Sequence, residues 1–173
     1  MTFMTTEQRL TGSASSFTDA AVAAWKLNIQ RATKIFDGLT DEQFFQQIAP
    51  NRNRILYILG HLTAVHDRMI PLLGLGERLH PELDPIFITA PDRTVDILPS
   101  PAELKQYWTE INTLLLNGYL SFSPEQWLER HTAVSEEDFA KDPTRNRFTV
   151  FLSRTNHAAF HIGQLVLVRN KEN

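Results

Sequence analysis

The stretch that decides the fold is "RTNHAAFHIGQL", residues 154–165, near the end of a chain of 173 residues. Its two histidines, His157 and His161, are four positions apart, and the segment around them favours a helix. Residues four apart on a helix lie on the same side, one turn from each other. Both imidazoles can therefore reach one metal ion. The same face also carries the side chains of Arg154, Gln164 and Val168.

A third imidazole is available far upstream, at His61. It lies in "RILYILGHLTAVHDRMIPLL", residues 54–73, among apolar neighbours that predict a buried helix face. A charged imidazole would be costly there unless it is hydrogen-bonded or bound to a metal. Three neutral imidazoles from two helices would leave an open coordination position for water, as catalytic metal sites do. His61, His157 and His161 are therefore the predicted metal ligands.

The same histidines have an explanation without a metal, which the residues alone leave open. A single buried histidine is more often a hydrogen-bonded core residue than a ligand, and a pair at this spacing also arises by chance. His66 is five residues from His61, about 140° around a helix, so we expect it beside the ligands or at the surface. His80 and His131 fall in predicted loops, where we expect solvated side chains.

Apolar residues that recur at intervals of three and four predict four long amphipathic helices. They cover residues 17–39, residues 53–73, a stretch that begins at Ser100, and residues 148–170. Short helical turns are predicted after Thr40 and Ser123, where each residue starts a capping box. Residues 1–16 are polar and aperiodic, so we expect a loose lead-in. Without any strand pattern, the chain is predicted to be an all-α four-helix bundle and a single domain of residues 1–173.

Between the second and third helices, residues 74–100 carry prolines at four positions and cannot form one continuous helix. A connection of this length inside a compact domain usually has a function or packs as a lid. We therefore expect a long crossover that covers a pocket rather than a linker between domains. The polar run "HTAVSEEDFAKDPTRNR", residues 131–147, is expected to be a solvated connection.

Composition narrows the classes of partner. The net charge is −3 with acidic and basic residues interspersed, which argues against nucleic acid and against a membrane surface. The chain shows neither a signal peptide nor a long apolar run, so we expect a cytoplasmic protein. It has no cysteine, which leaves histidine, carboxylate and backbone as metal ligands. It also lacks a Gly-rich phosphate loop and the GxSxG and HExxH motifs.

A "GHL" in the second predicted helix, a long crossover and "NHAAFHIGQL" in the last helix resemble the DinB-like (damage-inducible) family of bacterial metal-binding four-helix bundles. The resemblance covers nearly the whole chain, and its sharpest part is the H-x-x-x-H-x-G-Q run paired with an upstream histidine. Matched position by position, the resemblance implies that His61, His157 and His161 bind the metal. Gly163 and Gln164 match the "GQ" of the family.

The resemblance also implies a function. It implies a divalent ion, typically zinc or nickel, with water completing its shell, and a homodimer. Some similar proteins are thiol-dependent transferases or isomerases, and a chain without cysteine would need a low-molecular-weight thiol as cosubstrate. We therefore expect a metal-dependent enzyme acting on a small molecule, with Gln164 supporting a ligand histidine. The alternatives are a non-catalytic, stress-associated metal- or ligand-binding bundle and a bundle without metal.

Overall fold

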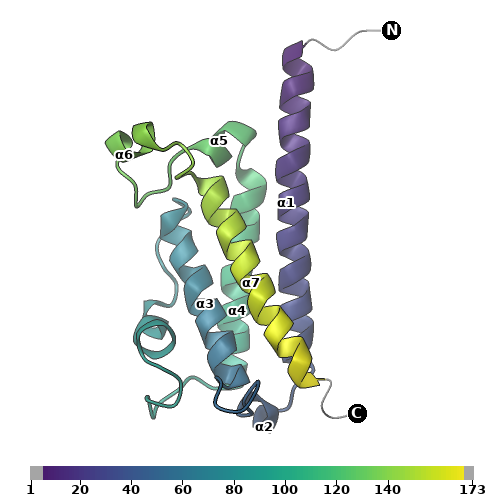
Figure 1. Ribbon diagram of the computed structural model, residues 1–173, viewed down its shortest axis with the longest axis vertical. Coiled ribbons are helices and arrows are strands. Elements are labelled where there is room, and N and C mark those ends of the chain that lie inside the picture. Colours follow the sequence, from purple (N-terminus) through teal and green to yellow (C-terminus); the bar gives the residue numbers. More distant parts are fainter. Residues whose placement is uncertain (1–5, 170–173) are drawn as a thin grey trace.

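Four long helices run side by side in the computed structural model, which describes the backbone of residues 6–169 and the side chains of residues 15–168 (Figure 1). They are α1 (Thr6–Asp37), α3 (Ile55–Leu72), α4 (Pro101–Ser121) and α7 (Arg147–Arg169). Residues 6–169 contain no β-strand, only two isolated β-bridges, and the all-α prediction is confirmed. Within the same residues, every helix is too short or too polar to cross a bilayer.

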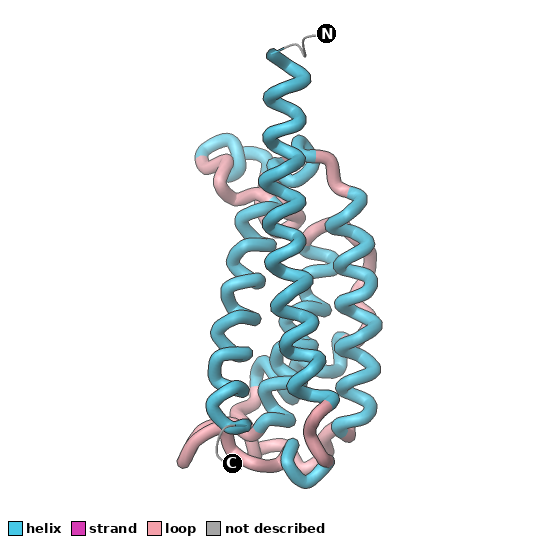
Figure 2. Tube along the Cα trace, turned by 90° about the vertical axis from the view of Figure 1, so that its right-hand side faces the viewer, coloured by secondary structure: helices cyan, strands magenta, loops and turns pink. Residues whose placement is uncertain are grey.

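The helices are held together by two clusters of buried apolar side chains. α3 packs against α4, while α1 packs against α7 and α4, and most of the loops lie at the two ends of the bundle, apart from the crossover beside α3 (Figure 2). One cluster lies around Phe36, Leu59 and Trp108, and the other around Trp25 and Tyr119. Each fully buried side chain of this size contributes about 1.5–3 kcal/mol relative to an exposed one. Because both clusters draw on all four long helices, α3 and α7 are fixed relative to each other.

Capping boxes start the short helices α2 (Asp41–Phe44) and α5 (Pro124–Leu128), as predicted, and α4 as well. In each, a hydroxyl accepts a backbone N–H that the first helical turn leaves without a partner. The short helices bury Phe44 and Trp127, whereas Phe45 is exposed. The caps therefore fix the residue at which each of these helices begins, and the two short helices each place an aromatic ring in the core.

α3 ends at Leu72, with Pro71 inside its last turn. Gly74 has a φ of 74°, and its N–H donates to the carbonyl oxygen of Pro71 while the N–H of Leu75 donates to that of Ile70. This pair of hydrogen bonds and the left-handed glycine form a Schellman motif. The predicted helix end is thus correct, with Gly74 rather than Pro71 turning the chain.

Two segments are helical where we expected irregular chain. α1 begins at Thr6, so the prediction of a loose lead-in is wrong for residues 6–16, while residues 1–5 lie outside the described part. Once a packed helix exists, each added residue gains a hydrogen bond, and this compensates for weak helix formers such as Gly12. The second segment is α6 (Glu136–Lys141), which Ser135 caps within the polar run. Local capping and acidic residues in the first turn suffice for this short helix without an apolar face.

The crossover between α3 and α4 is ordered along the side of α3. It contains a 3₁₀ turn, η1 (Pro81–Leu83), and a π-helical turn, η2 (Pro85–Thr89), and both turns contact α3. Phe87 is fully buried, and Asp92 forms an ion pair of 2.6 Å with Arg54 at the start of α3. The expected long crossover therefore packs against the helix that carries His61.

Candidate metal centre

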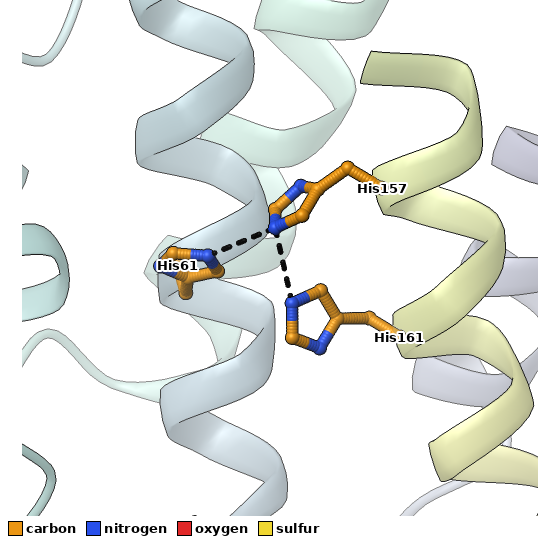
Figure 3. A group of neighbouring side chains, drawn as sticks. All are labelled: His61, His157 and His161. Carbon is orange, nitrogen blue, oxygen red and sulfur yellow. Dashed lines mark hydrogen bonds between the residues drawn. The ribbon is translucent and has the colours of Figure 1, made fainter. Parts of the chain in front are cut away.

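Three partly buried imidazoles from two helices converge between α3 and α7. His61 projects from the middle of α3, and His157 and His161 project from successive turns of α7 (Figure 3). Nε2 of His157 lies 3.3 Å from Nε2 of His61 and 3.2 Å from Nε2 of His161. One ligand atom from each of the three residues lies within 4.8 Å of the others. Residues 96 positions apart in the sequence thus meet at one point.

These separations suit a single metal ion. Two nitrogen ligands about 2.1 Å from a tetrahedral zinc ion are roughly 3.4 Å apart, close to the observed contacts of 3.2 and 3.3 Å. Among the residues that the structure describes, this is the one group of histidine and carboxylate side chains with such spacing. The donor set, three neutral nitrogens, fits zinc, nickel, cobalt or copper better than magnesium or calcium.

Hydrogen bonds on the outer nitrogens fix two of the rings. Nδ1–H of His61 donates to the carbonyl oxygen of Phe87 at 2.9 Å, and Nδ1–H of His161 donates to Oε1 of Gln164 at 2.8 Å. A neutral imidazole that carries its proton on Nδ1 has a free lone pair on Nε2. Both rings therefore present an Nε2 lone pair to the centre, and the outer acceptor oxygens raise their basicity as ligands.

The third ring, His157, prevents the three imidazoles from satisfying all their lone pairs by hydrogen bonds to one another. Nδ1 of His157 is buried and has no hydrogen-bond partner among the described residues. One N–H on Nε2 of His157 cannot fully serve the lone pairs of His61 and His161 at once, whereas one divalent ion accepts all three lone pairs. The residues present therefore fit a metal better than they fit an ordinary hydrogen-bonded core.

Burial favours the neutral form of two of the rings, His157 and His161. Burial, reinforced by the neighbouring His161 and His61, lowers the pKa of His157 to about 4. Burial also lowers the pKa of His161, against the opposing effect of its hydrogen bond with Gln164. Neutral imidazoles are the form that binds metals, so at pH 7 these two rings need lose no proton to become ligands.

Two residues that shape the site were missed in the sequence. Phe87 supplies the carbonyl oxygen for His61, and its ring lies where a Cβ on residue 60 would be, so only glycine fits at Gly60. Gly60 directly precedes His61, and a glycine inside a strongly apolar helix is the signal that another segment approaches closely. The sequence could not show that the segment is η2.

Contrary to expectation, His66 lies neither at the surface nor beside the three clustered histidines. It is fully buried between α1, α3 and α4, where its ring stacks on Trp108 and its Nδ1–H donates to Oδ1 of Asn112 at 2.8 Å. Burial lowers its pKa to about 4. His66 is therefore a neutral core histidine outside the triad, and helical spacing alone could not distinguish inside from outside at this position.

The two loop histidines are also less solvated than expected. His80 stacks on Tyr107 with ring centroids 3.8 Å apart and contacts the carboxylates of Glu82 and Glu110. His131 is partly buried, and its Nδ1 has no partner among the described residues. Neither residue belongs to the group formed by His61, His157 and His161.

A pocket of about 420 Å³ opens directly onto the three-histidine cluster. α3 and α7 form most of its wall, η2 contributes Ile88, and the lining includes His61 and His157 together with Arg68 and Arg154. A small molecule could thus reach a metal held by the histidines. The crossover thus contributes one residue, Ile88, to the wall of the pocket, and its role as a cover stays a prediction.

Comparisons with known proteins agree with this architecture. The model of the DinB superfamily matches residues 24–165, which include all three histidines of the cluster. The chain is also similar to the crystal structure of a conserved protein from Enterococcus faecalis, with 19% sequence identity and a TM-score of 0.62. That alignment covers 88% of this chain and 94% of the other, and at such identity it shows the fold alone. No curated protein matches the chain.

Proposed function

This chain belongs to the DinB superfamily, and from the geometry of its three histidines we propose that it is a metal-dependent enzyme acting on a small molecule. The proposed ligands are His61, His157 and His161, with zinc or nickel as the ion. The observation that carries the proposal is the convergence of three Nε2 atoms beside a pocket, with two of the rings oriented by Nδ1 hydrogen bonds.

The proposed reaction is thiol-dependent transfer or isomerisation. A divalent ion at this position would supply Lewis acidity, lowering the pKa of a coordinated thiol or water toward neutral pH. The chain has no cysteine, so the thiol would be a cosubstrate that enters the pocket. His61 and His161 would hold the ion together with His157, and Phe87 and Gln164 would keep their rings oriented for it.

Metal content tests the site. Elemental mass spectrometry on protein purified without a His-tag should give about one equivalent of divalent metal per chain, as a single three-histidine site requires. His61→Ala and His157→Ala should lose it while circular dichroism stays helical. His80→Ala is the matched control, because it removes an imidazole outside the cluster and should retain the metal. A parent that stays metal-free after incubation with zinc and nickel would contradict the site.

Chelation separates the enzyme from a purely binding protein. The metal-loaded protein should show turnover in a screen that pairs low-molecular-weight thiols with electrophilic small molecules, and a chelator should abolish it without unfolding the chain. Metal that raises the free energy of unfolding but supports no turnover would favour the alternative, a stress-associated binding bundle.

We further propose that the protein is a homodimer through the outer face of α7. Leu152, Phe160, Val166 and Leu167 are exposed on α7, and Gly163 on the same face has open space around it. Large apolar side chains that are exposed on one helix face can mark an interaction site. A second copy of the same helix would offer the matching apolar face that a twofold interface needs.

A further inference from the structure

We propose that Arg154 binds a negatively charged group of the substrate beside the metal, so that the pocket selects small molecules with an anionic group next to their metal-binding atom. The inference rests on the proposed function, because it assigns a substrate class to the same pocket. Arg154 and His157 both line this pocket, and no residue that lines it carries a carboxylate.

Arg154 is unusual among the arginines of the protein. Among the described residues, the other partly buried arginines each form an ion pair, namely Arg54 with Asp92, Arg78 with Asp67 and Asp84, Arg130 with Glu136, and Arg147 with Glu129. Arg154 is also partly buried, yet its side chain has no ion pair or hydrogen bond within this part of the chain. The guanidinium of Arg154 is therefore not neutralised by a carboxylate of the described chain, and an anionic ligand in the pocket can pair with it.

The local carboxylates are already engaged elsewhere. Asp84 accepts hydrogen bonds from the guanidinium of Arg68 and from both terminal nitrogens of Arg78. Asp67, which is fully buried, accepts from Arg78 and from the backbone N–H groups of Leu79 and His80. The second arginine of the pocket, Arg68, is therefore neutralised by the protein, whereas the charge of Arg154 is left for a ligand.

The position of Arg154 fits a ligand that also reaches the metal. Arg154 precedes His157 by three residues on α7, and residues at this spacing are neighbours on a helix surface, with Cβ atoms about 5–6 Å apart. A second pocket, of about 330 Å³, shares Arg154 and Leu72 with the first and includes Arg145 but no carboxylate. Arg154 thus lies between the histidine cluster and a second pocket, and neither pocket is lined by a carboxylate.

The guanidinium group recognises carboxylates through parallel N–H donors. A ligand with one carboxylate on the metal and a second on Arg154 should therefore bind more tightly than one that ends in a methyl group. Succinate and butyrate form such a pair, because they have the same chain length and differ in the second carboxylate. The visible absorption of the cobalt-loaded protein reports binding of either probe at the metal.

The test is a titration of the cobalt-loaded parent, Arg154→Gln and Arg68→Gln with succinate and with butyrate. The parent should bind succinate about tenfold more tightly than butyrate, the effect of one charge-assisted pair of hydrogen bonds. Arg154→Gln should lose this preference, while its affinity for butyrate and for cobalt stays unchanged. Arg68→Gln removes the same charge from the same pocket and should keep the preference, because Asp84 already neutralises Arg68.

The outcomes separate the two proposals. A parent that binds no cobalt would overturn the metal site and this inference with it. A parent that binds cobalt but shows no preference for succinate would overturn the role of Arg154 and leave the metal site standing. An equal loss in Arg154→Gln and Arg68→Gln would mean that the overall charge of the pocket, rather than Arg154, attracts the anion, and would also overturn the assignment.

Discussion

For metal binding, we expect the hydrogen bond on the outer nitrogen, Nδ1, of each imidazole to matter as much as the position of the histidine in the sequence. His61 and His161 have acceptors for their Nδ1–H groups, a backbone carbonyl from η2 and a side-chain amide from α7, whereas Nδ1 of His157 has none in the described part of the chain. Hydrogen bonds of this kind fix the tautomer and the ring plane. We therefore expect metal affinity to depend on Gln164 and Phe87 as well as on the histidines.

Gln164→Leu should weaken zinc binding by about 10- to 100-fold, because it removes the acceptor that orients His161. The measurement is a competition titration with a chromogenic chelator. Gln164→Glu is the matched control, since it keeps an acceptor oxygen at the same position and should retain affinity. Equal affinities for the parent and Gln164→Leu would show that the ring needs no such support.

His66 should make the stability of the metal-free protein fall in mild acid. Its pKa is lowered from 6.5 to about 4, so the unfolded chain takes up a proton below pH 6.5 that the folded protein takes up only near pH 4. The free energy of unfolding is unaffected by His66 above pH 6.5 and decreases through this window, by roughly 3 kcal/mol in total. Urea unfolding between pH 7 and pH 4 measures it.

The control for this pH dependence is His66→Gln, which removes the titrating ring. Its unfolding free energy should decline less steeply than that of the parent between pH 6.5 and pH 4, whatever its absolute stability. Parallel curves would contradict the assignment of this pH dependence to His66. Both proteins are compared with a chelator present, so that metal release does not contribute.

At the level of elements, the crossover has a structural task beside the three-histidine cluster. η2 packs into the gap that Gly60 leaves on α3, and this contact brings the carbonyl group of Phe87 to His61. The ion pair between Arg54 and Asp92 ties the following chain to the start of the same helix. The crossover therefore orients the ring of His61 as well as lining the pocket.

Gly60→Ala should destabilise the protein by about 1–3 kcal/mol, because its methyl group would overlap the ring of Phe87. It should also weaken metal binding, since a displaced Phe87 carries its carbonyl away from His61. Thermal unfolding and zinc competition measure the two effects. Gly163→Ala is the matched control on α7, where nothing lies within 4 Å of the new methyl group. It should stabilise the helix by up to about 1 kcal/mol.

At the level of the whole molecule, the bundle brings α3 and α7 together through a core to which all four long helices contribute. The exposed outer face of α7 carries the apolar surface of the proposed dimer, on the opposite side of the helix from its buried residues. Phe160 is 63% and Leu167 65% exposed, values that a partner helix would reduce. The same helix would then carry metal ligands inward and an interface outward.

Phe160→Glu combined with Leu167→Glu should convert the proposed dimer to a monomer, because two like charges would be buried against each other. Light scattering coupled to size exclusion measures the mass. Ile97→Glu is the matched control, since Ile97 is 86% exposed on the crossover and lies outside α7. A parent that is monomeric at high concentration would refute the dimer.

The sequence by itself determined most of the four long helices, the caps of α2 and α5 and the identity of the three clustered histidines, but neither the first turns of α1 nor α6. Apolar periodicity, capping boxes and the spacing of His157 and His161 are local properties, and local properties can be read along the chain. It did not determine the inside position of His66 or the acceptor for His61, and it carried no sign that Arg154 lacks an ion-pair partner among the described residues. Those depend on which segments meet across the bundle. Long-range packing decides such contacts. It brings together residues that are far apart in the chain, and the local sequence around one of them does not indicate which other residue it meets.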